Sequence, residues 1–207
     1  MARGFTLIET AMATVIIGVG VVAIVEAQQH FMQSNAWSSQ AATGTFLANE
    51  IREFTHNLPR HDPVTGLSIN GGALSGWGPE SGEVTVDDID DIDDIDGLTF
   101  GEAGDYPGPI NAFGEIIPEI NADGEVVVDE YGNELSMQGW VQTVIVEKLD
   151  AFDSGTVIDD DAFDAPSGSF EGRDVDEFPL RVTVIVSYQG PYDALPAEVT
   201  RVEWIVP

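Results

Sequence analysis

An acidic repeat in the middle of the chain holds the residues best suited to bind a ligand. It reads Asp-Asp-Ile three times over 87–95 and continues with Asp96 and Gly97, and no Lys or Arg occurs from 61 to 147. Hard cations such as Ca²⁺ bind several oxygen ligands, which clustered carboxylates supply. The repeat therefore predicts a calcium site, and its aspartates are the candidate ligands: Asp87, Asp88, Asp90, Asp91, Asp93, Asp94 and Asp96.

Other interpretations of the acidic residues stay open. The EF-hand pattern does not fit, because aligning Gly97 with the EF-hand glycine puts Ile92 at the first ligand position and Ala103 where the bidentate glutamate belongs. A solvated acidic loop that keeps the protein soluble is the alternative to a calcium site. The run 159–161, together with Asp164, is a second candidate for cation binding.

Motifs for catalysis and for cofactor binding are absent from the sequence. The chain contains no cysteine, no G-x-S-x-G, no P-loop and no G-x-G-x-x-G fingerprint, so we expect no enzymatic activity and no cofactor besides calcium. His56 and His61, with Asp62, could form a metal cluster, although histidines in surface loops are more often solvated. The net charge of -30, from 37 acidic and 7 basic residues, argues against binding to nucleic acid phosphates.

A long apolar segment begins near the N-terminus. Residues 5–25 include one charged side chain, Glu9, and as a helix they would span about 30 Å, the thickness of a bilayer core. Arg3 precedes the segment and the next Lys or Arg is Arg52, so the positive-inside rule places the N-terminus in the cytoplasm. A secretory signal fits poorly, because no A-x-A-like cleavage site follows the segment. A plain membrane anchor does not explain Glu9, whose carboxylate costs free energy in lipid without a partner.

The residues around Glu9 carry a family resemblance. The segment Arg3-Gly4-Phe5-Thr6-Leu7-Ile8-Glu9 resembles the N-terminal signal of bacterial type IV pilins and type II secretion pseudopilins. The resemblance implies that a prepilin peptidase removes a leader of residues 1–4 by cutting after Gly4, and that Phe5 becomes the N-methylated first residue. It implies that Glu9 pairs with the Phe5 amine of a neighbouring subunit. The implied partners are other pilin or pseudopilin subunits and an inner-membrane assembly platform.

The apolar pattern predicts that the helix continues through 26–58. No Pro occurs before Pro59, and a single apolar stripe recurs at helical spacing, formed by Leu47, Ile51, Phe54 and Leu58. Residues 59–139 are acidic and rich in Gly and Pro, and minor strands are expected at 83–86 and 125–128. The loop 150–179 has no disulfide to fasten it, so packing or a metal must do so.

Residues 140–207 contain three segments that alternate in polarity and are rich in β-branched residues. They lie at 140–149, 180–188 and 198–206, and three such strands form an antiparallel sheet with one apolar face. The helical stripe supplies the cover for this face. The sequence therefore predicts an α+β, pilin-like fold, in which a long N-terminal helix packs on a C-terminal antiparallel β-sheet with long acidic loops.

These features favour a structural role over catalysis. We expect a filament subunit, a minor pilin or pseudopilin, of a type IV pilus or a type II secretion filament. It would cross the inner membrane once, with a periplasmic or extracellular head, before it enters a filament. The alternative is a membrane-tethered, extracellular, calcium-dependent adhesion protein that does not polymerise. Glu9 favours the filament, because a simple tether would do better with an apolar residue.

Overall fold

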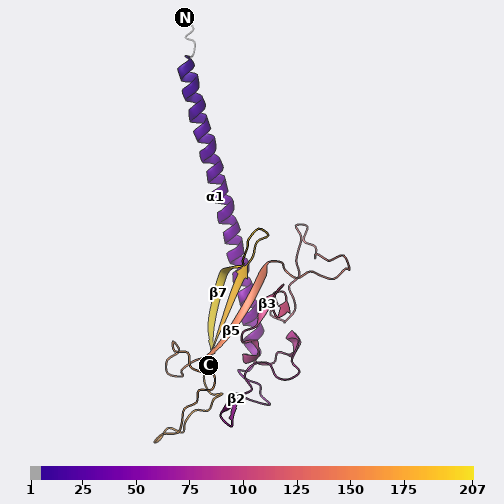
Figure 1. Cartoon of the computed structure of the whole chain (residues 1–207), viewed down its shortest axis with the longest axis vertical. Coiled ribbons are helices and arrows are strands. Elements are labelled where there is room, and N and C mark those ends of the chain that lie inside the picture. The colour runs from indigo at the N-terminus through magenta and orange to yellow at the C-terminus, as the bar shows by residue number, and fades with distance from the viewer. Residues whose placement is uncertain (1–5) are drawn as a thin grey trace. The chain divides into compact units, whose positions relative to one another are not determined.

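A computed structural model describes residues 6–207 of the chain, which divides into two compact units, 1–42 and 43–207. The helix α1 runs from Leu7 to Phe54, so its last part belongs to the second unit (Figure 1). No proline interrupts this range, and a short 3-10 turn, Thr55–Asn57, ends it before Pro59. The prediction of one long N-terminal helix is therefore confirmed.

Large apolar side chains cover the first part of α1, residues 7–25, on every side. Between 7 and 25 these side chains are roughly half to nine-tenths exposed, from Val25 at 46% to Leu7 at 89%. A helix that is apolar all round has no polar face to present to water. By length and composition this segment could cross a membrane.

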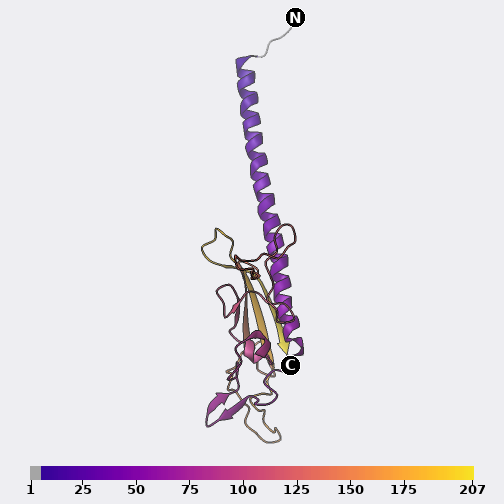
Figure 2. The same cartoon turned by 90° about the vertical axis from the view of Figure 1, so that its right-hand side faces the viewer.

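The second unit contains a five-stranded sheet in the order β4-β3-β5-β6-β7. Its long strands lie alongside the end of α1 (Figure 2). Its three long strands are β5 (Trp140–Lys148), β6 (Leu180–Tyr188) and β7 (Ala197–Val206), and they pair antiparallel as predicted. Two short strands were not predicted: β3 (Thr99–Gly101), antiparallel to β5, and β4 (Tyr106–Pro107), parallel to β3. A separate small hairpin joins β1 (Ser68–Asn70) to β2 (Ala73–Ser75).

The end of α1 packs on this sheet through the predicted stripe. Leu47 and Ile51 are buried in one core cluster with the inward-facing valines of β5 and β6, and Phe54 and Leu58 pack against the same cluster. A buried polar side chain also joins the helix to the sheet by a hydrogen bond. Gln142 on β5 donates from Nε2 to the carbonyl oxygen of Leu47 over 2.8 Å. The α+β class is therefore confirmed.

Residues 59–139 differ in detail from the predicted minor strands. Residues 83–86 form no strand, and Val86–Asp88 is instead a 3-10 turn with a capping box between Thr85 and Asp88. Residues 125–128 do enter β-bridges, which join Val126 to Ile120 and Val128 to Glu134. Because these bridges are isolated, the segment is a series of tight turns rather than a sheet.

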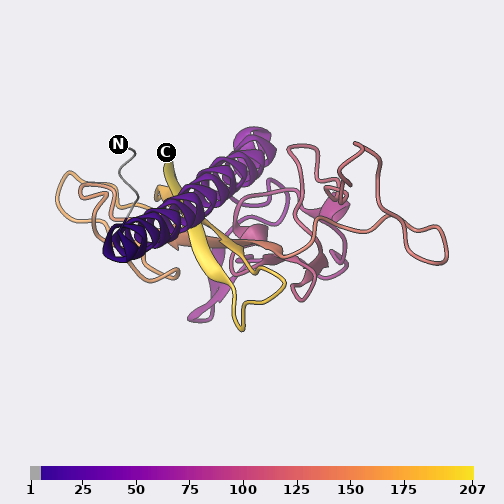
Figure 3. The same ribbon diagram turned by 90° about the horizontal axis from the view of Figure 1, so that it is seen from above.

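The segment 102–139 leads into one end of β5, and the loop 150–179 leaves from the opposite end (Figure 3). A buried lysine fastens it. Lys148 is fully buried, and its Nζ atom donates to the carbonyl oxygens of Asp160 and Ala162, each over 2.8 Å. The same ammonium lies 4.7 Å from the centre of the Phe178 ring. The contacts of Lys148 therefore hold the loop 150–179 against β5, in a chain that has no cysteine to form a disulfide.

Candidate functional site

Two places in the described residues combine charge with an unusual environment, and the first is the start of α1. The Oε2 atom of Glu9 accepts hydrogen bonds from the backbone N–H and the hydroxyl of Thr6, both over 2.8 Å. The carboxylate thus satisfies an N–H group at the helix start, where such groups lack a partner within the helix. The predicted leader 1–4 and the predicted processing residues Gly4 and Phe5 lie outside the described residues.

The side chains around Glu9 are apolar. Leu7, Ile8 and Met12 are all more than half exposed, and within residues 6–207 no Lys, Arg or His forms an ion pair with Glu9. The bond to Thr6 occupies one carboxylate oxygen. If this segment lies in lipid, the charge requires a partner from another molecule, because an unpaired charge there costs several kcal/mol.

The second place is the acidic repeat, whose local structure follows from its period. Ile89, Ile92 and Ile95 are all buried in the core cluster. A spacing of three returns a side chain to the same face in 3-10 geometry, and the repeat contains the 3-10 turn Asp93–Ile95. The isoleucines therefore draw the repeat into the protein. Asp91, Asp93 and Asp94 are consequently 0% exposed, so this part of the repeat is not a solvated acidic loop.

Five carboxylates converge at this point, and we call them the carboxylate cluster: Glu80, Glu83, Asp90, Asp91 and Asp94. One oxygen from each of Glu80, Glu83 and Asp94 lies within 4.8 Å of the others, and the same holds for Asp90, Asp91 and Asp94. Asp94 belongs to both groups and joins them. The arrangement brings together oxygen ligands from two short stretches of chain, 80–83 and 90–94.

Each inner carboxylate of the cluster divides its two oxygens between two roles. Asp91 accepts the backbone N–H groups of Asp93 and Asp94 with Oδ1, and Asp94 accepts those of Asp90 and Asp91 with Oδ2. The second oxygen of each, Asp91 Oδ2 and Asp94 Oδ1, is buried and accepts no hydrogen bond within residues 6–207. Glu80 has the same division, since Oε1 accepts from the hydroxyl of Thr65 and the buried Oε2 accepts none.

Burial and mutual repulsion act on these carboxyl groups together. Burial, followed by hydrogen bonding to and repulsion from Asp93, raises the pKa of Asp91 to about 8. Burial and the charge of Asp91 raise the pKa of Asp94 to about 6, and burial and the charge of Asp94 raise that of Glu80 to about 7. Ionising Asp91, Asp94 and Glu80 is therefore less favourable than ionising free carboxyl groups.

His61 lies against the other side of the repeat. Its Nδ1 atom is 2.7 Å from Asp93 Oδ2, and its ring centre is 6.0 Å from that of Trp77. Burial lowers the pKa of His61 to about 4, so the ring is neutral at physiological pH. Within residues 6–207, the metal cluster that His56, His61 and Asp62 could have formed is not among the groups of three potential ligands. His61 is a buried partner of Asp93 rather than a solvated loop residue.

Four of the predicted calcium ligands lie outside the carboxylate cluster: Asp93, which pairs with His61, and Asp87, Asp88 and Asp96. Asp87 is exposed and lies outside the carboxylate cluster. Asp88 caps its own turn by accepting from the backbone and hydroxyl of Thr85. Asp96 accepts the backbone N–H of Val146 with Oδ1 over 2.8 Å and the indole N–H of Trp77 with Oδ2 over 3.3 Å. The sequence analysis missed Glu80 and Glu83, which precede the repeat, although they belong to the same stretch without Lys or Arg.

The second acidic run does not gather its carboxylates. Asp164 pairs with Arg173 over 3.4 Å, and the carbonyl of Asp160 is bound by Lys148. Within the described part of the chain, no group of three potential metal ligands includes 159–161 or Asp164. The structure therefore offers a converging set of ligands at the carboxylate cluster and not here.

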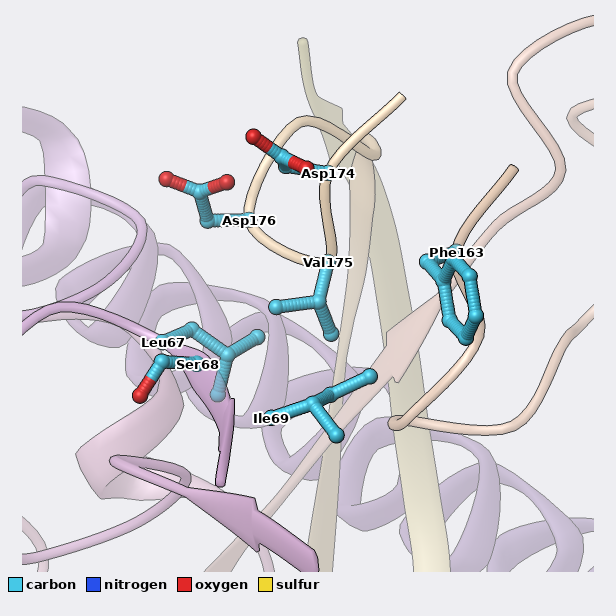
Figure 4. A pocket seen from close by; sticks show the side chains of 7 residues that line it. All are labelled: Leu67, Ser68, Ile69, Phe163, Asp174, Val175 and Asp176. Carbon is cyan, nitrogen blue, oxygen red and sulfur yellow. The ribbon is translucent and has the colours of Figure 1, made fainter. Parts of the chain in front are cut away.

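A shallow pocket of about 410 Å³ lies between the strand β1 and the loop 150–179 (Figure 4). The side chains of Leu67, Ile69 and Val175 point toward one another, whereas the carboxylates of Asp174 and Asp176 point away from them. The pocket contains none of the predicted site residues and no nucleophile paired with a base.

The chain was compared with protein families, curated proteins and solved structures, and no significant match was found in any of the three.

Proposed function

We propose that this chain is a structural subunit of a type IV pilus or a type II secretion filament, processed by a prepilin peptidase and assembled through its N-terminal helix. The observation that carries the proposal is the carboxylate of Glu9 on an exposed apolar helix, where within residues 6–207 no basic side chain pairs with it. A bilayer solvates the apolar side chains but not this charge.

A filament resolves this conflict because it brings a second copy of the helix alongside the first. The resemblance of Arg3 to Glu9 to the pilin signal supplies the partner, since processing after Gly4 would create a free amine at Phe5. A carboxylate and an ammonium that are each costly in lipid are less costly as a pair. The α+β head, in which residues 47–58 cover a sheet, agrees with the pilin-like architecture expected from the sequence.

The proposal places the chain in the inner membrane before assembly. The N-terminus lies in the cytoplasm, the helix crosses once, and the head is periplasmic or extracellular. The acidic, glycine-rich head and the absence of cysteine favour a minor subunit. Such a subunit interacts with the prepilin peptidase, the inner-membrane assembly platform and other pilin or pseudopilin subunits.

Intact-mass and N-terminal analysis of the protein from native membranes and from sheared filaments tests this proposal. We expect a mature chain that begins at N-methylated Phe5 and occurs in the sheared fraction. A Gly4→Leu variant is the control, because a bulky side chain at the cleavage position should leave the chain uncut. An uncut wild-type chain confined to membranes would contradict the proposal and favour the tethered adhesion protein.

A further inference from the structure

We propose that the carboxylate cluster of Glu80, Glu83, Asp90, Asp91 and Asp94 binds one calcium ion, which fastens the acidic repeat beneath the end of α1. This inference does not depend on filament assembly, because it concerns the head alone. It is carried by the buried, unpartnered oxygens of Glu80, Asp91 and Asp94, and by the lack of an ion pair to any cluster carboxylate within residues 6–207.

The first argument is that three carboxylates of the cluster, those of Glu80, Asp91 and Asp94, each have a buried oxygen that accepts no hydrogen bond within the described residues. Asp91 and Asp94 are 0% exposed. A buried polar atom without a partner costs about 1–3 kcal/mol, and more when it is charged. The free oxygens belong to groups whose ligand atoms lie within 4.8 Å of one another. One cation can therefore satisfy several of them at once.

The second argument is charge balance. Within residues 6–207, none of the five cluster carboxylates forms an ion pair with Lys, Arg or His. The imidazole of His61 contacts the repeat at Asp93, which is not a member of the cluster. Buried carboxylates are normally paired, protonated or bound to a metal. A divalent cation supplies the missing positive charge without a side chain.

The third argument concerns the kind of cation. All ligands of the cluster are carboxylate oxygens, which favours a hard cation over zinc or copper. The oxygens come from two short stretches, 80–83 and 90–94, that belong to no α-helix or strand. Ca²⁺ accepts adaptable sets of six to eight oxygens, whereas Mg²⁺ requires a near-ideal octahedron.

The position of the site gives the ion a structural role. The backbone N–H of Ile92, within the cluster stretch 90–94, donates to the carbonyl oxygen of Pro59 just after α1. At the end of the acidic repeat, the backbone N–H of Gly97 donates to the carbonyl oxygen of Val144 on β5, and the Asp96 carboxylate accepts from the backbone N–H of Val146 on the same strand. Calcium would therefore hold together a loop that joins the end of the helix to the central part of the sheet.

Calorimetric titration of CaCl₂ into the full chain in detergent, after treatment with chelator, tests the proposal. The titration is done at high NaCl concentration, because salt screens diffuse attraction between Ca²⁺ and so acidic a surface. We expect one saturable site per chain, an increase in melting temperature with Ca²⁺, and weaker binding of MgCl₂. A wild-type chain with no saturable calcium heat and no calcium-dependent melting shift would overturn the proposal, and binding of Mg²⁺ as tight as that of Ca²⁺ would overturn the assignment to calcium.

A matched pair of variants locates the site. Asp90 is exposed and its carboxylate accepts no hydrogen bond within residues 6–207, so Asp90→Asn should fold and melt like the wild type in chelator. It should nevertheless raise the calcium Kd by about tenfold or more, because it removes a ligand. Asp87→Asn removes the same charge from the same repeat outside the cluster, and its Kd should equal that of the wild type. Equal weakening in both variants would overturn the assigned site.

Discussion

The Nδ1 atom of His61 lies 2.7 Å from Oδ2 of Asp93, and both side chains are buried. This contact ties the chain just after α1 to the centre of the acidic repeat. Because burial keeps the imidazole neutral, it brings no positive charge to the neighbouring carboxylates. The contact therefore positions the repeat, but it does not neutralise the negative charge of the neighbouring carboxylates.

The cation-free head should lose stability as pH rises from 6.5 to 8. The pKa values of Asp91, Asp93 and Glu80 are raised to about 8, 7 and 7, mainly by burial, so the folded chain holds protons in this range that the unfolded chain has released. The free energy of unfolding then falls with pH. His61 acts in the opposite direction, but only between its folded pKa of about 4 and its ordinary 6.5.

Denaturant unfolding in chelator at pH 6.5 and pH 8 measures this slope. Saturating Ca²⁺ serves as the comparison, because a bound cation favours the ionised carboxylates and should flatten or reverse the slope. A stability that is independent of pH over this range in chelator would contradict the raised pKa values.

Asp94→Asn should abolish the increase in melting temperature produced by Ca²⁺ without lowering the melting temperature measured in chelator. The amide oxygen can still accept the backbone N–H groups of Asp90 and Asp91, so the loop keeps its turn. Removing a buried charge beside Asp91 should leave the melting temperature in chelator unchanged or higher, whereas the increase produced by Ca²⁺ should be lost. Differential scanning fluorimetry with and without Ca²⁺ checks both parts, and a retained calcium shift would count against Asp94 as a shared ligand.

Glu9→Ala should leave membrane insertion intact and prevent incorporation into filaments. The substitution removes a charge from an apolar helix, which favours insertion, but it also removes the partner of the neighbouring amine. Glu26→Ala is the matched control, because Glu26 lies on the same helix beyond the apolar segment. Immunodetection in membrane and sheared fractions provides the measurement, and normal incorporation of the Glu9 variant would contradict the assembly mechanism.

Gln142→Leu should destabilise the head by about 1–3 kcal/mol, the cost of leaving buried backbone groups without a partner. The Gln142 side chain accepts from the N–H of Ile110 and donates to the carbonyls of Ile110 and Leu47. For a chain of this size the melting temperature should fall by about 2–4 °C per kcal/mol. Gln138→Leu, at an exposed position, is the control and should change the melting temperature little.

The large elements of the fold are predictable because their signals are local. The helical stripe from Leu47 to Leu58 and the alternating strands, such as 180–188, repeat a period over many residues. The strands β3 and β4 have only three and two residues, too few for a period to appear. They depend on side-chain contacts, such as the carboxylate of Asp105 that accepts from the backbone and hydroxyl of Thr99.

The candidate site is only partly predictable for a related reason. The composition of the repeat indicates a cation site, but it does not show which aspartates turn inward. Burial of Ile89, Ile92 and Ile95 decides this, and it leaves Asp87 outside the cluster. Glu80 and Glu83 join the site only through tertiary packing, which no local spacing records.

The period of three in the acidic repeat also bears on how such a site can change during evolution. Each Asp-Asp-Ile unit combines one apolar residue for the core with two carboxylates. Gain or loss of a whole unit would keep the remaining isoleucines in register while changing the charge by two. A stretch of chain built in this way can change its number of carboxylates in discrete steps, while the isoleucines that pack in the core stay the same.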